Sequence, residues 1–410
     1  MTRSKVAVVR TRPESVFDDY ARAMRMAGYQ EALPKDKDTA LKINISWGKF
    51  YPACSTTPWQ LEGVIRTLLA DGYSRDLIHA CHNRTVVVSA RAGERKNRQK
   101  VVVDRYGLRN VHLYEKDEEW IRYEPKGETK VLHEVFPKGI SIPKRLIGEN
   151  VIHLPTMKTH VFTTITGAMK NAFGGLLNEK RHWTHSVIHE TLADLLMIQK
   201  EIHPGIFAVM DGAVAGSGPG PRCMDVHIKN LVLASADQVA IDAVAAKIMG
   251  FDPLSLDFIR SAYERGLGTG DLKEIDVVGE DISEMNWRFE SAQTVASHGQ
   301  HAIYHGIFKP IETLLLRTPL VVWAYVASWA YHDWYWYPFI GRRRVARFME
   351  TPWGNMFQRY GDEGDLPLGS GESPITHTDE HVPSPLLARS YPSTWMRNVL
   401  RNSKITELVG

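Results

Sequence analysis

Short apolar runs alternate with amphipathic segments through the first 280 residues of the chain. Runs rich in β-branched residues are typical of buried strands, whereas apolar positions three or four residues apart predict helices. The expected strands are Val6–Val9, Ala40–Ile45, Leu77–Ala80, Asn150–His153, Ile206–Met210, Leu231–Ala234 and Ile275–Val278. The expected helices are Pro13–Ala27, Pro58–Leu69, Thr164–Phe173, Ser186–Ile202 and Gln238–Met249. Strands that alternate with helices predict an α/β fold with mainly parallel sheets and flanking helices.

The same pattern divides the chain into four parts. Residues 1–147 form a predicted N-terminal α/β lobe and residues 148–285 a second α/β lobe, with a soft boundary near Ile147 after shorter strands and turns. Residues 286–360 are predicted to be an aromatic-rich helical C-terminal region. Residues 361–410 begin with a stretch rich in Gly, Pro, Ser and acidic residues, which predicts a mobile tail.

Within the third part, residues 311–347 combine aromatic and basic side chains. Nine Trp, Tyr and Phe residues lie between Trp323 and Phe339, and Arg342, Arg343 and Arg344 follow them. Charged residues and a proline interrupt the run, so a membrane-spanning helix is not expected. Two interpretations remain open. The rings either cap the core or form a homo-oligomer contact, or the segment lies on a membrane surface with its rings at headgroup level.

Composition narrows the class of protein. The chain has 410 residues, 43% of them hydrophobic and 24% charged, as in ordinary globular proteins. A net charge of +3 is too small for a nucleic-acid partner. Cys54, Cys81 and Cys223 are too few for a disulfide framework or a four-cysteine cluster, which predicts a reducing compartment. Without a signal-peptide-like apolar run at the start, we expect a cytoplasmic protein, peripheral to a membrane if the aromatic segment contacts lipid.

Reactive side chains concentrate between His153 and Glu190, which include five histidines and three lysines. Lys158 and His160 follow a predicted strand, where parallel sheets bind ligands. Lys170 and Asn171 follow a glycine near a predicted helix start, where backbone N–H groups and a cation can hold a phosphate or carboxylate. Taken singly, Lys158 and Lys170 could be solvated lysines. Together they predict a site for a small anionic substrate.

Three histidines further on have the spacing of metal ligands. His182, His185 and His189 would share one face of a helix, which can direct imidazoles at a common metal ion. The alternative is that they cap the helix or pair with Glu179 or Glu190.

Other candidates lie outside this segment. His82 follows the strand Leu77–Ala80 and is either a functional residue or a satisfied loop histidine. Gly212 and Gly218 lie in loops after Ile206–Met210 and could bind a cofactor, although this stretch lacks the lysine of a P-loop. Asp237 is predicted to cap a helix that contains Asp242, which could reach the site or form a salt bridge.

The chain resembles the domain of unknown function 362 family over roughly residues 4–280. The Lys170-Asn171 block is the most specific part of the resemblance. Many members carry a cysteine-rich ferredoxin-like module, for which this chain has no counterpart. The residues that carry the resemblance are Lys42-Ile43-Asn44, Thr56-Thr57-Pro58, Pro155–His160, Thr166–Asn171 with Gly174, Asp211-Gly212, Gly218-Pro219, Asp237 with Asp242, and Gly250–Pro253.

A more distant resemblance is to the nickel-dependent lactate racemase family. His82, Thr159-His160, Lys170 and His185 follow the order and approximate spacing of that family's site. The resemblance implies that His82 and His160 transfer protons, that Lys170 anchors a nickel pincer nucleotide and that His185 ligates the metal. The chain departs from the pattern where Asn83 separates His82 from Arg84, and where Met169-Lys170-Asn171 replaces a glycine-rich approach to the lysine.

From these residues we expect an enzyme that moves a proton or hydride on a small anionic organic molecule, as a racemase or isomerase does. Two imidazoles with pKa values near about 6.5 suit reversible proton transfer at neutral pH. The expected cofactor is a divalent metal such as nickel or iron, or a nucleotide-derived group. The alternative is an accessory protein that binds a nucleotide, metal or iron–sulfur partner for another enzyme.

Overall fold

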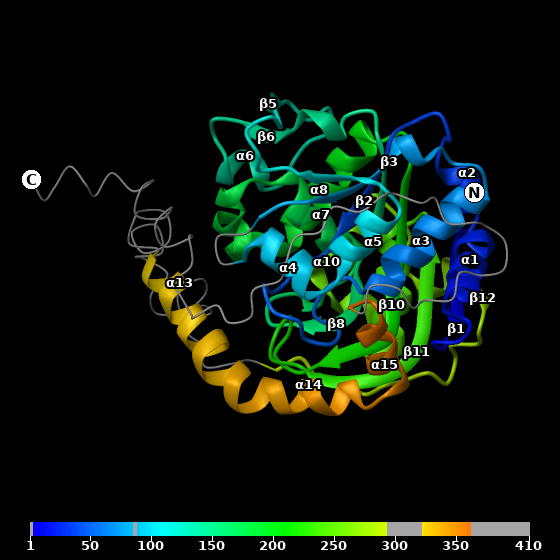
Figure 1. The fold of residues 1–410 in the computed structure, drawn as a ribbon. Coiled ribbons are helices and arrows are strands. Elements are labelled where there is room, and N and C mark those ends of the chain that lie inside the picture. The colour runs from blue at the N-terminus through cyan, green and yellow to red at the C-terminus, as the bar shows by residue number, and fades with distance from the viewer. Residues whose placement is uncertain (1–2, 85–87, 293–321, 362–410) are drawn as a thin grey trace, which may run out of the picture.

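The computed structural model describes residues 3–84, 88–292 and 322–361. It confirms the α/β class: a mixed, mostly parallel sheet lies between two layers of helices (Figure 1). The strands of the main path follow the order β12-β1-β11-β10-β7-β2-β3-β4. The predicted tail, apart from Gly361, and the first residues of the segment 311–347 lie outside the described residues.

The seven expected strands form, but β10 runs on to Ser217, so Gly212 lies in a strand and not in the expected loop. Hydrogen bonds pair β1 with β11 and β10 with β11 in antiparallel fashion, whereas β12, β7, β2, β3 and β4 join their neighbours in parallel. A small antiparallel pair, β5 with β6, lies outside the main sheet. The strand bounds are β1 Ser4–Arg10, β2 Thr39–Ile43, β3 Ile78–His82, β4 Arg109–His112, β5 Trp120–Tyr123, β6 Ile140–Pro143, β7 Asn150–Leu154, β8 Thr156–His160, β9 Thr164–Ile165, β10 Ile206–Ser217, β11 Asp225–Ser235 and β12 Ile275–Gly279.

The two predicted lobes share this sheet. Strand β2, from the first lobe, pairs with β3 on one side and with β7, from the second lobe, on the other. Strand β1, from the first lobe, lies between β11 and β12, which come from the second lobe. Position 147 therefore does not separate two sheets.

Helices cover both faces of the sheet. The helices α1 Val16–Met26 and α3 Pro58–Ala70 lie on one face, and α7 Ala168–Leu176 and α9 Gln238–Met249 lie on the other. Further helices pack around these four. Their bounds are α2 Tyr29–Ala32, α4 Ala90–Lys96, α5 Gln99–Arg105, α6 Leu132–Val135, α8 Ile188–Ile202 and α10 Asp257–Glu264, with 3₁₀ turns at Arg75–Leu77, Lys144–Leu146, Glu179–Val187, Pro253–Ser255 and Leu272–Glu274.

Three predicted helix starts are too early, and the first is that of α1, which was predicted from Pro13 and begins at Val16. The segment predicted as helical from Thr164 begins with β9, which pairs with β8, and α7 starts only at Ala168. Gly167, with φ +123°, makes the break between them because this backbone conformation suits glycine. Likewise α8 starts at Ile188, after the 3₁₀ turn Glu179–Val187.

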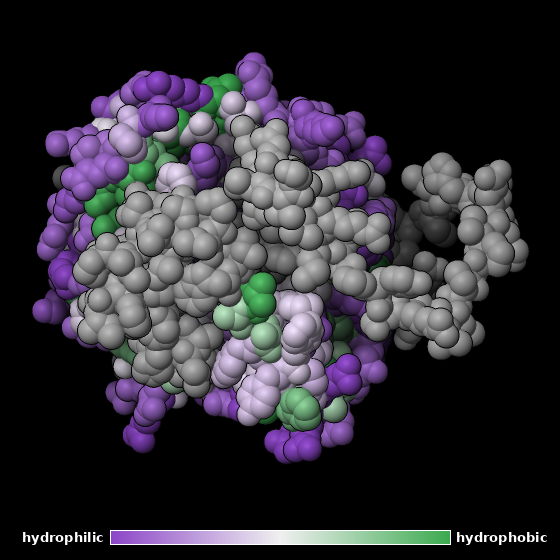
Figure 2. Space-filling view, turned by 90° about the vertical axis from the view of Figure 1, so that its left-hand side faces the viewer, coloured by the Kyte–Doolittle hydropathy of each residue, from purple (hydrophilic) through white to green (hydrophobic). Residues whose placement is uncertain are grey.

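The described C-terminal region is helical and packs against the sheet. It comprises α13 Val322–Trp329, a π-helical segment Ala330–Gly341, α14 Arg342–Met349 and α15 Pro352–Arg359. Figure 1 shows these elements as one arm that runs along an edge of the α/β body. In Figure 2, which looks onto the side of the molecule that carries this arm, pale and green side chains gather below the centre beside purple ones.

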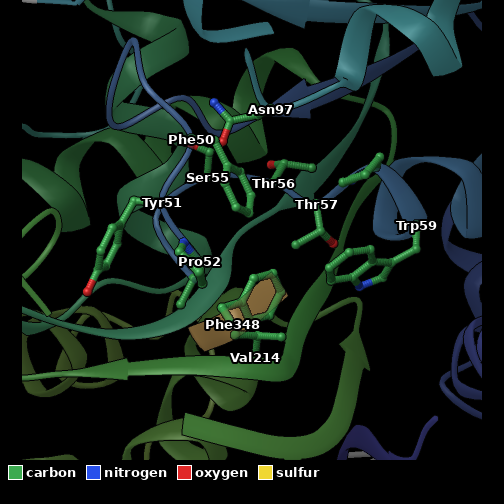
Figure 3. A pocket seen from close by; sticks show the side chains of 12 residues that line it. Phe50, Tyr51, Pro52, Ser55, Thr56, Thr57, Trp59, Asn97, Val214 and Phe348 are labelled. Carbon is green, nitrogen blue, oxygen red and sulfur yellow. The ribbon is translucent and has the colours of Figure 1, made fainter. Parts of the chain in front are cut away.

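The base of the arm belongs to the hydrophobic core. Phe348 and Trp353 are buried in the same cluster as Trp59 of α3 and Val214 of β10. Phe348 and Val214 also border a gap of about 10 Å³, which has room for about one water molecule (Figure 3). Among the nine rings of the predicted aromatic segment, Trp336 is buried in this cluster, so the interpretation that the rings cap the core is correct for that ring.

Trp353 gives a test of this packing. It is 1% exposed, its ring lies 5.0 Å from the ring of Trp59, and its Nε1 donates to Asn230 Oδ1 at 2.8 Å. We predict that Trp353→Ala lowers the free energy of unfolding by about 3–5 kcal/mol, because it leaves a cavity and an unpaired amide oxygen. Denaturant unfolding measures this. The control Trp334→Ala, whose ring is 60% exposed, should cost less than about 0.5 kcal/mol. Equal losses would contradict the packing.

Candidate functional site

A cavity of about 240 Å³ opens at the carboxyl ends of β2, β3 and β8. This edge is where open parallel sheets commonly bind ligands. The end of β3 contributes His82, the end of β8 contributes His160, and α7 contributes Lys170. Six predicted site residues line this cavity: His82, His160, Lys170, Asn171, His182 and His185.

The cavity wall is rich in positive charge. Lys42, Lys170, Arg181 and Arg222 line it, and no lining residue in the described part of the chain is Asp or Glu. The guanidinium of Arg181 donates to the backbone oxygens of Gly174 and Arg84, and Arg222 donates to the backbone oxygen of Ser46. Such contacts hold the guanidinium groups in place at the wall. The site therefore suits an anionic ligand.

Lys170 is the lysine most altered by this environment. Its Nζ has no hydrogen bond or ion pair with the described residues and lies 5.5 Å from the centre of the Phe173 ring. Burial, followed by the charges of Lys158 and Arg181, lowers the pKa of Lys170 to about 7. A large fraction of this amine is therefore uncharged, and so nucleophilic, near neutral pH.

Two other lysines support the wall. Burial lowers the pKa of Lys42 to about 8, and its Nζ donates to the backbone oxygen of Ile43 at 2.7 Å. Lys158 does not line the cavity. It is buried behind Ser46, where its Nζ donates to the backbone oxygen of Cys54 at 2.5 Å, and burial lowers its pKa to about 8.

Hydrogen bonds fix the tautomer of His82. Its Nε2 lies 2.7 Å from Asn110 Oδ1 and 3.0 Å from Glu94 Oε2. Both oxygens only accept, because Asn110 Nδ2 donates to Glu94, so Nε2 carries the proton. The other ring nitrogen, Nδ1, is buried and has no hydrogen-bond partner among the described residues. Neutral His82 therefore has the lone pair of a general base on Nδ1.

Glu94 also joins His82 to a second histidine. His112 Nε2 lies 3.0 Å from the same carboxylate oxygen, and the rings of His82 and His112 stack at 4.7 Å. These contacts with the two histidines hold the pKa of Glu94 well below its usual range, against the opposing effect of burial. Ligand atoms of the three residues lie within 4.8 Å of one another, so the cluster also has donors that suit a metal ion.

His160 has the same tautomer as His82, but the other ring nitrogen makes its hydrogen bond. Its Nδ1 accepts a hydrogen bond from the backbone N–H of Phe162 at 3.1 Å. In the neutral ring the proton therefore lies on Nε2, which can donate it. Burial and the positive charge of Lys170 hold the pKa of His160 well below its ordinary value. Both histidines at the strand ends therefore carry the proton on Nε2, but His82 leaves the lone pair of Nδ1 without a hydrogen bond to the described residues, whereas His160 leaves the Nε2 N–H.

The three histidines predicted to share a helix face do not lie on one α-helix. His182 and His185 lie on the 3₁₀ turn, whose three-residue period places them on one edge, and both line the cavity. His185 Nδ1 donates to the His182 backbone oxygen at 2.9 Å, which leaves the lone pair on Nε2, as a metal ligand requires. His189 lies on α8 and stacks on Phe258, away from the cavity lining.

The start of α7 holds a carboxylate that belongs to the protein. Asp242 of α9 accepts hydrogen bonds from the backbone N–H groups of Ala168 at 2.6 Å and Met169 at 3.1 Å. A Cβ at Gly167 would lie 2.4 Å from Asp242 Oδ1, so glycine is required for this contact. The expectation that this helix start binds a ligand anion is therefore wrong. Asp237 caps α9 as predicted.

The two predicted cofactor-binding glycines do not line the cavity. Gly212 packs against Met157, and the backbone oxygen of Gly218 accepts from Thr159. In the connection between β10 and β11, Pro221 and Arg222 line the wall instead. Asn171 lines the cavity and its Nδ2 donates to the Lys42 backbone oxygen at 2.8 Å.

Several functional candidates were not predicted from the sequence. Lys42, Arg181 and Arg222 line the wall, and Glu94 and Asn110 orient His82. Lys42 could have been predicted as a site residue, because it lies near the end of an expected strand, beside Asn44. Nothing in the sequence indicated the Glu94 contact, because α4 lies outside the predicted elements.

The chain is similar to a protein family and to a cyanobacterial protein. The model of the family described as "Domain of unknown function (DUF362)" matches residues 39–247, about half of the chain. A similar protein is the "Thylakoid-associated protein sll1697" of Synechocystis sp., 25% identical over 179 residues, or 42% of this chain. The chain covers 56% of that relative's length. No solved structure matches.

The Lys170 amine provides a test of the site. We predict that it titrates near pH 7, about three units below an ordinary lysine, because folding disfavours its charged form. The uncharged, reactive fraction should therefore rise between about pH 6 and 8. NMR titration of the protein after reductive methylation with ¹³C-formaldehyde measures this, with Lys170→Arg to assign the signal. A Lys170 signal that titrates above about pH 10 would contradict the predicted environment.

Proposed function

Because the chain belongs to the DUF362 family, whose description names no activity, we propose its function from the site: an enzyme that transfers a proton on a small anionic organic molecule, as racemases and isomerases do. The observation that carries the proposal is the pair of histidines on one cationic cavity: His82 leaves the lone pair of Nδ1 without a hydrogen bond to the described residues, and His160 leaves its Nε2 N–H.

Substrate binding follows from the charges of the wall. A carboxylate or phosphate would be held by Lys42, Arg181 and Arg222, which line a wall whose described residues include several cations and no Asp or Glu. Such charges also favour loss of a proton from the carbon beside a carboxylate, because negative charge then develops on its oxygens. The cations therefore bind the substrate and stabilise the transition state.

The two histidines then divide the proton transfer. Neutral His82 accepts the substrate proton at Nδ1 and becomes an imidazolium. His160 gives its Nε2 proton to the carbanion, and the charge of Lys170 and the Phe162 N–H stabilise the imidazolate that is left until solvent returns a proton. The charge that His82 gains is stabilised by Glu94, 3.0 Å from Nε2. Exchange with solvent resets both rings. The reverse direction uses the same groups with their roles exchanged.

The resemblance to the nickel-dependent lactate racemase family supports a cofactor in this cavity. Lys170 Nζ has no hydrogen bond with the described residues, the wall suits a phosphate group, and His185 has the tautomer of a metal ligand. These features fit a nucleotide-derived cofactor anchored at Lys170 with its metal at His185. Such a group, when bound, supplies a hydride acceptor. Native mass spectrometry and metal analysis test for it.

Hydrogen exchange with solvent tests the proton transfer. We predict that the native protein exchanges the C–H next to the carboxylate for deuterium in at least one member of a panel of 2-hydroxy acids and their phosphorylated analogues in D₂O. His82→Asn and His160→Asn should each lower the rate by about 10²–10⁴-fold. Proton NMR follows the exchange. His133→Asn, on an exposed histidine, is the control and should leave the rate unchanged.

A histidine whose replacement leaves the rate unchanged would contradict the two-histidine mechanism. Stoichiometric metal or nucleotide without any exchange would instead support the accessory-protein alternative.

The variant Lys170→Ala tests whether Lys170 anchors the cofactor or only contributes to the stability of the fold. We predict that it abolishes exchange and any covalent adduct without lowering the free energy of unfolding, because the side chain makes no hydrogen bond and burial disfavours its charged form. Intact-protein mass spectrometry and denaturant unfolding check the two statements. Exchange at the wild-type rate would remove Lys170 from the site.

A further inference from the structure

We propose that the arm formed by residues 326–347 docks the protein on an anionic membrane surface. Its outward face carries Val326, Trp329, Trp334, Tyr335, Phe339 and Ile340. These six make up most of the nine large hydrophobic side chains that are exposed in the described chain. Trp334, Tyr335 and Phe339 are each at least 57% exposed. Soluble surfaces rarely gather so much apolar area without a partner.

The inward face of the arm is fixed to the body. Trp336 is buried beside Trp47, whose Nε1 donates to Asp333 at 3.3 Å. Tyr337 donates to the backbone oxygen of Phe50 at 3.1 Å, and Arg344 pairs with Asp225 at 2.6 Å. The exposed rings therefore stand on a helix held in place along its length. They cannot all turn inward without breaking these contacts.

The charges of the outward face have one sign. Arg342, Arg343 and Arg347 are exposed. Asp333 is the acidic residue of this stretch, and it faces Trp47 and Lys49. A membrane of anionic lipids has negative headgroups over apolar acyl chains. The apolar band can contact the acyl chains while the arginines that follow it contact the headgroups.

The geometry favours lying on a membrane over crossing one. Within the described ranges, every helix falls short of the length and apolar character that crossing a bilayer requires. Trp and Tyr prefer the headgroup level, where the ring is apolar and its N–H or O–H stays wet. A symmetric contact with a second copy would bring arginines together with no exposed acidic residue between 326 and 347 to pair with them.

Sedimentation of the full-length protein with vesicles tests the proposal. We expect binding to phosphatidylcholine vesicles that contain 30% phosphatidylserine, weak binding to pure phosphatidylcholine, and loss of binding as salt is raised, within the range where charges are screened. Arg342→Gln with Arg343→Gln should weaken the partition coefficient by about 30-fold, from about 1 kcal/mol for each arginine. Trp334→Ala with Phe339→Ala should weaken it at least about tenfold.

Matched controls lie outside the arm. Arg95→Gln with Lys96→Gln removes two neighbouring exposed cations, and Ile147→Ala removes an exposed apolar side chain. Both should bind as the wild type does, and thermal unfolding should be the same for all variants. No binding at low salt, or equal loss in the controls, overturns the proposal. A dimer that dissociates in Trp334→Ala with Phe339→Ala, without vesicle binding, overturns it in favour of a second copy.

Discussion

The positive charge gathered at the carboxyl edge of the sheet is the constraint on which the site depends. Lys42, Lys170, Arg181 and Arg222 share one cavity, and its lining residues in the described ranges include no carboxylate. Burying several cations close together is costly, and a protein can respond by releasing protons or by binding an anion. The pKa of Lys170 near 7 is the first response, and the proposed substrate is the second. The lowered pKa and the proposed anion binding both follow from a described cavity lining that holds cations and no carboxylate.

The scaffold keeps its carboxylates close to the site but out of the cavity. Asp242 caps α7 and Glu94 binds two imidazoles behind the wall. Each is buried and fully engaged, so neither neutralises the cavity. Asp242 instead fixes the helix that carries Lys170, and Glu94 fixes the ring that we propose as the base. This arrangement separates the groups that position the site from the groups that meet a ligand.

The α/β class and most element positions could be predicted from the sequence because apolar periodicity reports directly on burial, as the exact match of α9 shows. Strand ends also located His82 and His160 correctly. The roles of Glu94 and Arg222 could not be predicted, because they depend on contacts between segments far apart in the chain. The prediction that His182, His185 and His189 share one helix face was wrong, because the first two lie on the 3₁₀ turn Glu179–Val187 and not on the α-helix.

The measurement that tests the central claim most directly is the affinity for sulfate, whose own charge stays constant, by calorimetry at pH 6.5 and pH 9. Lys170 and Lys42, with pKa values of about 7 and about 8, lose their charge over this range. Protonation and anion binding are linked, so the account predicts that sulfate binds the native protein at least about tenfold more weakly at pH 9. Equal affinity at both pH values, or no binding at pH 6.5, would contradict an anion site built on these lysines.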